Sequence, residues 1–328
     1  MPADNSSTNA NHVAQCVISF GSNLGNRHEL IAEAARKIAK SPLMKGGVFC
    51  TSRLFETPPI GGPKGQAPFL NAIAAFETHA SARDVLGFLQ ATEQDLGRRR
   101  HQRWDARSID LDVVLHGELV GGGTGLTVPH PRYTARRFVL RPACDVAGHF
   151  RDPRFGWTLD RLRQHLSEGL PSMALVGDLD TRQEICQRLA NEHGIRTFVP
   201  GPNPQPMAVV GNAPAPAQTS NCLPQSEFAE PIHLDSDAAW IAGYVPPLPK
   251  LSSDATSLPT VPRLVARIQR TTPATAWPAP HQMWPAGWDW PEYRLEVDDL
   301  DWAVKELASA LDSMRCAVEP VTQDGTWW

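Results

Sequence analysis

Two acidic residues two positions apart, Asp110 and Asp112, stand in the otherwise apolar stretch of residues 109–115. Side chains two apart on a β-strand share a face of the sheet. Two carboxylates on one face repel each other and lose hydration, and a divalent cation between them relieves both penalties. We therefore expect Asp110 and Asp112 to bind magnesium, with a solvated pair at a sheet edge as the alternative.

Arginines crowd the segment just before this pair, with five of them in residues 98–107. Arginine keeps its charge and forms bidentate hydrogen bonds, so a cluster beside a metal site suits a polyphosphate. The alternative is a nucleic-acid surface. The net charge of -4 argues against it, because such surfaces are broad and basic. We expect no nucleic-acid partner.

Length and composition set the wider limits. A chain of 328 residues favours two folded units. No apolar run reaches the roughly 18 residues of a membrane span, and the first 12 residues are polar, which predicts a cytoplasmic protein without a signal peptide or membrane partner. The six cysteines form no C-x-x-C pair, so we expect reduced thiols and no zinc site.

The elements that position the acidic pair alternate along the first half. Apolar periodicity predicts strands at residues 13–20, 48–55, 69–78 and 110–115, and helices at 27–40 and, after a Ser81 cap, up to residue 96. This order indicates an α+β sandwich with helices packed on a sheet. The loop at residues 61–65 lacks the spacing of a phosphate-binding loop, so we expect a mobile lid instead.

Five motifs together identify a family resemblance. They are F-G-S-N-L-G-N at residues 20–26, T-P-P-I-G at 57–61, F-L-N at 69–71, R-W-x-x-R-x-I-D-L-D at 103–112 and the segment 128–138. From about residue 14 to about residue 168, the chain resembles 6-hydroxymethyl-7,8-dihydropterin pyrophosphokinase of folate biosynthesis. The resemblance implies a ferredoxin-like core over residues 14–168. We expect a disordered tail before it, at residues 1–13.

The resemblance also implies roles for individual residues. Phe69 and Phe138 would sandwich the pterin ring, which stacks on aromatic faces. Further pterin contacts would come from the Asn71 amide and the backbone around Thr57 and Ile60. Arg98 and Arg107 would stabilise the transition state, and Asp110 and Asp112 would hold two magnesium ions. The ATP site would comprise Gln90, Glu93, Arg100, Arg103, Trp104, Thr127, His130 and Arg136.

The reaction implied is transfer of pyrophosphate from ATP, the co-substrate, to the hydroxymethyl group of the dihydropterin, with release of AMP. The rival hypothesis is a non-catalytic pterin- or nucleotide-binding sensor. Some relatives have a tyrosine where this chain has Pro131 and a basic residue where it has Gly125, so we expect either weaker nucleotide affinity or redistributed nucleotide contacts here.

The second half, residues 169–328, reads as a smaller α/β domain with long Pro-rich loops at 200–231, 246–262 and 272–291. We expect strands at 174–177, 240–245 and 264–269. We also expect a helix at 181–192 capped by Asp180, and another at 299–314. The sequence assigns this region no activity, and we expect a structural role or a protein partner.

Overall fold

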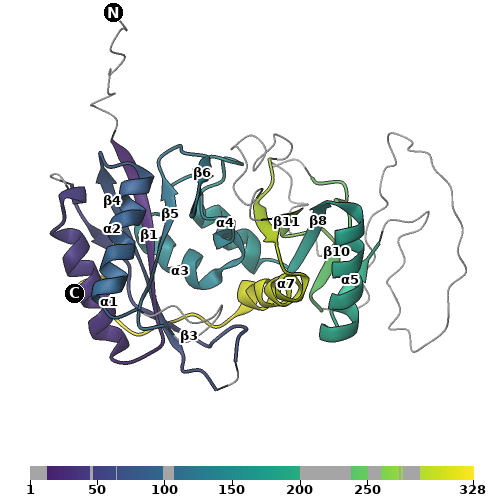
Figure 1. The fold of residues 1–328 in the computed structure, drawn as a ribbon, viewed down its shortest axis with the longest axis horizontal. Coiled ribbons are helices and arrows are strands. Elements are labelled where there is room, and N and C mark those ends of the chain that lie inside the picture. Colours follow the sequence, from purple (N-terminus) through teal and green to yellow (C-terminus); the bar gives the residue numbers. More distant parts are fainter. Residues whose placement is uncertain are drawn as a thin grey trace, which may run out of the picture.

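The computed structural model describes residues 13–44, 47–63, 65–98, 107–199, 238–249, 260–272, 275 and 289–328. All but the last residue of the tail predicted at 1–13, and most of the predicted Pro-rich loops, lie outside these residues. The described residues form a mixed α and β structure with two larger sheets and a small ribbon (Figure 1).

The first sheet carries the acidic pair and is antiparallel throughout. Its strand order is β13-β3-β4-β1-β5, with β2 also pairing β4. The strands are β1 (Ala14–Ser22), β2 (Cys50–Thr51), β3 (Phe55–Thr57), β4 (Phe69–Thr78), β5 (Asp110–His116) and β13 (Glu319–Pro320). The single strand predicted at 48–55 is therefore wrong: two short strands, β2 and β3, occupy this region, separated by residues 52–54.

Helices cover both faces of this sheet (Figure 1). On one face α1 (Arg27–Ala39) and α2 (Ala82–Asp95) pack on alternate strand residues, among them Ile18 and Leu111. On the other face α3 (Arg137–Val146) packs on the intervening residues, such as Val17. The period-2 alternation of apolar residues thus gives the sheet two buried faces.

The second sheet is parallel, with strand order β12-β11-β8-β10-β9. Its strands are β8 (Ser172–Gly177), β9 (Arg196–Phe198), β10 (Trp240–Ala242), β11 (Leu264–Arg270) and β12 (Glu292–Val297). Helices α5 (Leu179–His193) and α7 (Leu300–Arg315) accompany it. The predicted Asp180 cap is wrong: Asp178 caps α5, because its side chain accepts the N–H of Thr181 at 2.9 Å.

The remaining short elements lie outside the two larger sheets. They are η1 (Pro42–Met44), the ribbon β6 (Gly121–Gly123) and β7 (Leu126–Val128), η2 (Tyr133–Ala135) and α4 (Leu159–Ser167). One apolar cluster runs from Val17 of β1 through Leu140 of α3 to Leu295 of β12 and Leu307 of α7. The two halves therefore share a core, and the boundary expected near residue 168 stays a prediction.

The last residues return to the first sheet, where β13 pairs with β3. Trp327 packs edge-on against Phe20 and donates its indole N–H to the Ser52 carbonyl at 2.7 Å. Within the described part of the chain, no helix has the length and apolar character needed to cross a membrane. The five cysteines described there are all unpaired.

Candidate active site

A pocket opens on the α3 face of the first sheet, and its floor is set by strand register. Gly21 of β1 lies opposite Asn71 of β4 on one side and Asp110 of β5 on the other, while Ser19 lies opposite Asp112. A side chain added at Gly21 would come within 3.6 Å of the Asn71 amide oxygen and 3.8 Å of the Asp110 Cβ. Glycine at this position therefore leaves room between the amide and the carboxylates.

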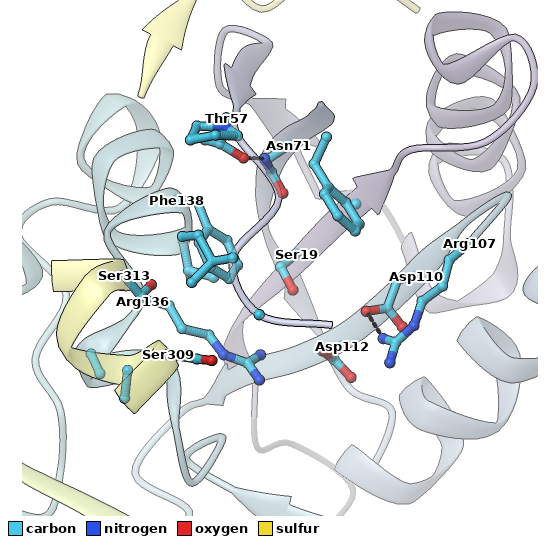
Figure 2. Close-up of a pocket in the computed structure, with 18 of the residues that line it drawn as sticks. Ser19, Thr57, Asn71, Arg107, Asp110, Asp112, Arg136, Phe138, Ser309 and Ser313 are labelled. Carbon is cyan, nitrogen blue, oxygen red and sulfur yellow. Dashed lines mark hydrogen bonds and ion pairs between the residues drawn. The ribbon is translucent and has the colours of Figure 1, made fainter. Parts of the chain in front are cut away.

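Asp110 and Asp112 both line the pocket, as expected for residues two apart on a strand. Leu111 between them points to the opposite, buried face among the residues under α1 and α2. Figure 2 shows the two carboxylates at one end of the pocket and the pair Thr57 and Asn71 at the other.

The end with the amide is a polar anchor beside aromatic rings. Asn71 is buried and donates from its side-chain amide to the Thr57 hydroxyl at 2.8 Å, which fixes the orientation of both groups. Phe69 and Phe138 line the same cavity from β4 and from the start of α3. A planar heterocycle with hydrogen-bonding edges fits these surroundings.

Arginines surround the acidic end. Arg107 donates to Asp110, and Arg98 pairs with the other oxygen of the same carboxylate at 2.8 Å. Arg136 projects into the pocket between Ser309 of α7 and Asp112 (Figure 2). These cations beside two carboxylates suit a polyanion that brings its own metal ions.

Glu93 lies behind Asp110 in the wall. It is buried, accepts the Leu111 N–H at 2.8 Å and pairs with Arg98. Burial raises the pKa of Glu93 to about 7, against the opposing effects of the Leu111 hydrogen bond and the charge of Arg98. Arg98 is thus held between two carboxylates and does not line the pocket, whereas Arg107 does.

His130 follows the Val128–Pro129 peptide and lies beside Asp112, with 4.0 Å between Nε2 and Oδ2. Burial, together with the charges of Arg136 and Arg132, holds the pKa of His130 well below its usual range. The imidazole is therefore neutral near pH 7 and can only donate from one ring nitrogen.

The predicted site residues divide into three groups. Those that line the pocket are Thr57, Ile60, Phe69, Asn71, Arg107, Asp110, Asp112, Arg136 and Phe138. Those that the structure describes but that do not line the pocket are Gln90, Glu93, Arg98, Thr127 and His130. Those that lie outside the described residues are Arg100, Arg103 and Trp104. Lys64, in the predicted lid at 61–65, also lies outside the described residues.

Several residues of the site were missed by the sequence analysis. Asn23, in the G-S-N-L-G motif, accepts the Arg107 N–H at 2.7 Å and donates its side-chain amide to Gln66 at 3.0 Å. The motif was recognised, but its task of holding Arg107 was not. Pocket residues from the second half were also missed: Tyr293, Glu306, Ser309, Ala310 and Ser313.

The sequence of the first half is similar to known proteins of one family. The sequence profile of the 7,8-dihydro-6-hydroxymethylpterin-pyrophosphokinase family matches residues 17–148. A 2-amino-4-hydroxy-6-hydroxymethyldihydropteridine pyrophosphokinase from Pseudomonas aeruginosa is 36% identical over 141 residues, which cover 43% of this chain and 85% of that protein. The chain belongs to the dihydropterin pyrophosphokinase family. The family and enzyme class predicted from the sequence are confirmed.

Two other relatives differ in how much of their own length matches this chain. The pyrophosphokinase of Haemophilus influenzae is 35% identical over 40% of this chain and 79% of its own length. The folic acid synthesis protein fol1 of Pneumocystis carinii is 38% identical over 43% of this chain, but the match spans only 19% of that protein. All these matches cover less than half of this chain.

Proposed function

We propose that this protein transfers pyrophosphate from ATP to the hydroxymethyl group of 6-hydroxymethyl-7,8-dihydropterin and releases AMP. The observation that carries the proposal is the single pocket in which the Thr57 and Asn71 anchor, two aromatic rings and the Asp110 and Asp112 pair come together. The family named for this activity is the one to which the chain belongs.

The pterin ring would stack between Phe69 and Phe138 with its edge on the Asn71 amide. Its hydroxymethyl oxygen would then face the carboxylate end and attack the β-phosphorus of ATP in line. The new O–P bond forms as the bond from the β-phosphorus to the α,β-bridging oxygen breaks. AMP leaves with that oxygen, and the hydroxyl proton is released to water. Positioning and charge stabilisation carry most of the rate in such transfers.

Magnesium fits the donor set. Among the described residues no group of three His, Cys, Asp or Glu side chains could hold a metal, so Asp110 and Asp112 would be the two protein carboxylates and the phosphates would supply other ligands. Two bound magnesium ions would neutralise charge on the attacking and leaving oxygens. Arg107 and Arg136 line the pocket and would bind the phosphates directly, while Arg98 would first have to leave Glu93.

The proposal extends to the fold of the first half. A ferredoxin-like β-α-β-β-α-β core over residues 14–168 is supported by the antiparallel strand order β3-β4-β1-β5 with α1 and α2 on one face. Two magnesium ions, ATP and the dihydropterin are the ligands proposed for it.

AMP release from magnesium ATP, with and without the dihydropterin, tests the function. We expect pterin-dependent AMP from the wild type and a loss of at least about 1000-fold in an Asp110→Ala, Asp112→Ala double variant, equivalent to about 4 kcal/mol of transition-state stabilisation. Glu118→Ala removes an exposed carboxylate after the same strand and should leave the rate unchanged. A folded wild type that binds pterin but forms no AMP would support the sensor hypothesis instead.

A further inference from the structure

The second half of the chain holds the segment from which His130, Arg136 and Phe138 reach the site. The Arg294 N–H of β12 donates to the Pro131 carbonyl at 2.9 Å. Three residues further along, the buried Thr134 hydroxyl donates to the Glu292 carbonyl at 2.8 Å. Both contacts join residues more than 150 positions apart, so this segment is fixed by the C-terminal region.

Glu306 of α7 is the charged centre of this contact. Its side chain is buried, lines the pocket and accepts the Tyr293 hydroxyl at 2.9 Å. The same oxygen lies 3.7 Å from Arg132 Nε, and the Arg132 guanidinium also lies over the Trp302 ring at 5.5 Å. A buried carboxylate is costly unless it is paired, so Glu306 and Arg132 fix each other's position.

Arg132 continues this connection to His130. Its backbone N–H donates to His130 Nδ1 at 3.1 Å. A backbone N–H can only donate, so Nδ1 accepts in this contact. It is shorter than the 3.5 Å between Arg136 Nη1 and Nε2, so the proton of the neutral ring is assigned to Nε2. This nitrogen is the one 4.0 Å from Asp112 Oδ2, so the donor of the ring is directed to the carboxylate end of the pocket.

We infer that Glu306 is a positioning residue of the active site, which acts through Arg132 to keep His130 donating from Nε2 toward the phosphates of ATP. The inference rests on the proposed function. It gives the second half of the chain a task in the first half's reaction: α7 and β12 complete the wall of the pocket and fix the segment at 130–138.

Kinetics of Glu306→Gln test this role. Glutamine still accepts the Tyr293 hydroxyl but removes the charge that holds Arg132. We expect kcat/KM for magnesium ATP to fall by about tenfold or more, as when a group that orients a ligand is lost. KM for the dihydropterin should stay within about twofold, because the Thr57 and Asn71 anchor is untouched. Asp312→Asn, an exposed carboxylate on the same helix, should change neither constant.

A second readout follows the ring itself. Nitrogen-15 NMR of labelled histidine, with the His130 signal assigned from a His130→Ala variant, separates the two neutral tautomers. We expect the Nε2–H form in the wild type and a larger Nδ1–H fraction in Glu306→Gln and in Tyr293→Phe. Unchanged tautomer populations together with unchanged kinetics in folded variants would overturn the inference. The AMP assay of the wild type is done before any variant is made. A wild type without pterin-dependent AMP release would overturn the proposed function itself.

Discussion

Arg107 illustrates how a single residue of the site is positioned from both sides. The Arg107 N–H donates to the Asn23 side-chain oxygen at 2.7 Å, and the Arg107 carbonyl accepts the Asn23 backbone N–H at 3.0 Å. Its guanidinium bonds to Asp110. The Ser22 hydroxyl adds a bond to the Ser108 carbonyl at 2.6 Å. The start of β5 is therefore tied to the end of β1, so two motifs far apart in sequence form one anchored unit.

His165, away from the pocket, makes stability depend on pH. It packs edge-on against the rings of Trp157 and Trp290, which also contact each other, and its Nε2 is 3.0 Å from the Arg263 carbonyl. Burial, together with the charge of Arg263, lowers the pKa of His165 to about 3. The unfolded chain takes up a proton near pH 6.5 that the folded chain refuses, so stability is complete above pH 6.5 and falls as the pH is lowered toward 3.

The expected size of this effect at pH 5 is about 2 kcal/mol in the free energy of unfolding, from about 1.4 kcal/mol for each pH unit. Urea unfolding of the wild type and His165→Gln between pH 5 and 7 measures it. The variant should lose less stability than the wild type over this range. His193→Gln, at an exposed position on α5, is the control and should follow the wild type. If the free energy of unfolding depends on pH in the same way in the wild type and in His165→Gln, the role assigned to His165 is contradicted.

At the scale of elements, local pattern was sufficient where a segment was long and its cap was close in sequence. The strand at residues 69–78 was predicted with the bounds that β4 has. The Ser81 cap of α2 was also predicted, and it is confirmed by a reciprocal pair of bonds with Asp84. Both signals lie within a few residues, which is why the sequence alone reveals them.

Short strands were missed because distant partners create them. β13 is two residues long, and it exists only through pairing with β3, more than 250 positions earlier. β12 directly follows a proline-rich stretch and was not predicted, although its parallel pairing with β11 spans six residues. No local pattern encodes such a pairing, since the energy comes from the partner strand.

The same distinction applies to the site. Asp110 and Asp112 could be placed on one face of a strand from their spacing, and the family resemblance supplied Phe69, Asn71 and Arg136, all of which line the pocket. The contributions of α7 and β12 could not be predicted. Glu306 reaches the pocket only because the second sheet packs beside the first, and nothing near Glu306 in the sequence indicates that contact.

At the scale of the whole molecule, the C-terminal segment joins the end of the chain to the first sheet. The Val321 N–H donates to the Leu54 carbonyl at 2.9 Å, and the Thr51 hydroxyl donates to the Gly325 carbonyl at 2.6 Å. Trp328 packs edge-on against Phe49. Long-range contacts of this kind make the stability of the first sheet depend on residues that follow the second.

Gly325→Ala tests this dependence. A Cβ at Gly325 would lie 1.9 Å from the Thr51 carbonyl oxygen, so the segment must move away. We expect a loss of about 1–3 kcal/mol in the free energy of unfolding and a change in tryptophan fluorescence. Gly87→Ala is the matched control, because nothing lies within 4 Å of its added Cβ in the middle of α2. Equal stability of the two variants would show that the segment contributes nothing.

The transfer of pyrophosphate as one unit is the central claim, and ATP labelled at the β-phosphorus tests it most directly. With wild-type protein, magnesium and the dihydropterin, we predict that the label moves into the pterin product while AMP remains unlabelled, because the attack occurs at the β-phosphorus. Label that stays in ADP would indicate transfer of the γ-phosphate alone, and label in free diphosphate would indicate attack by water. Either result would contradict the proposed reaction.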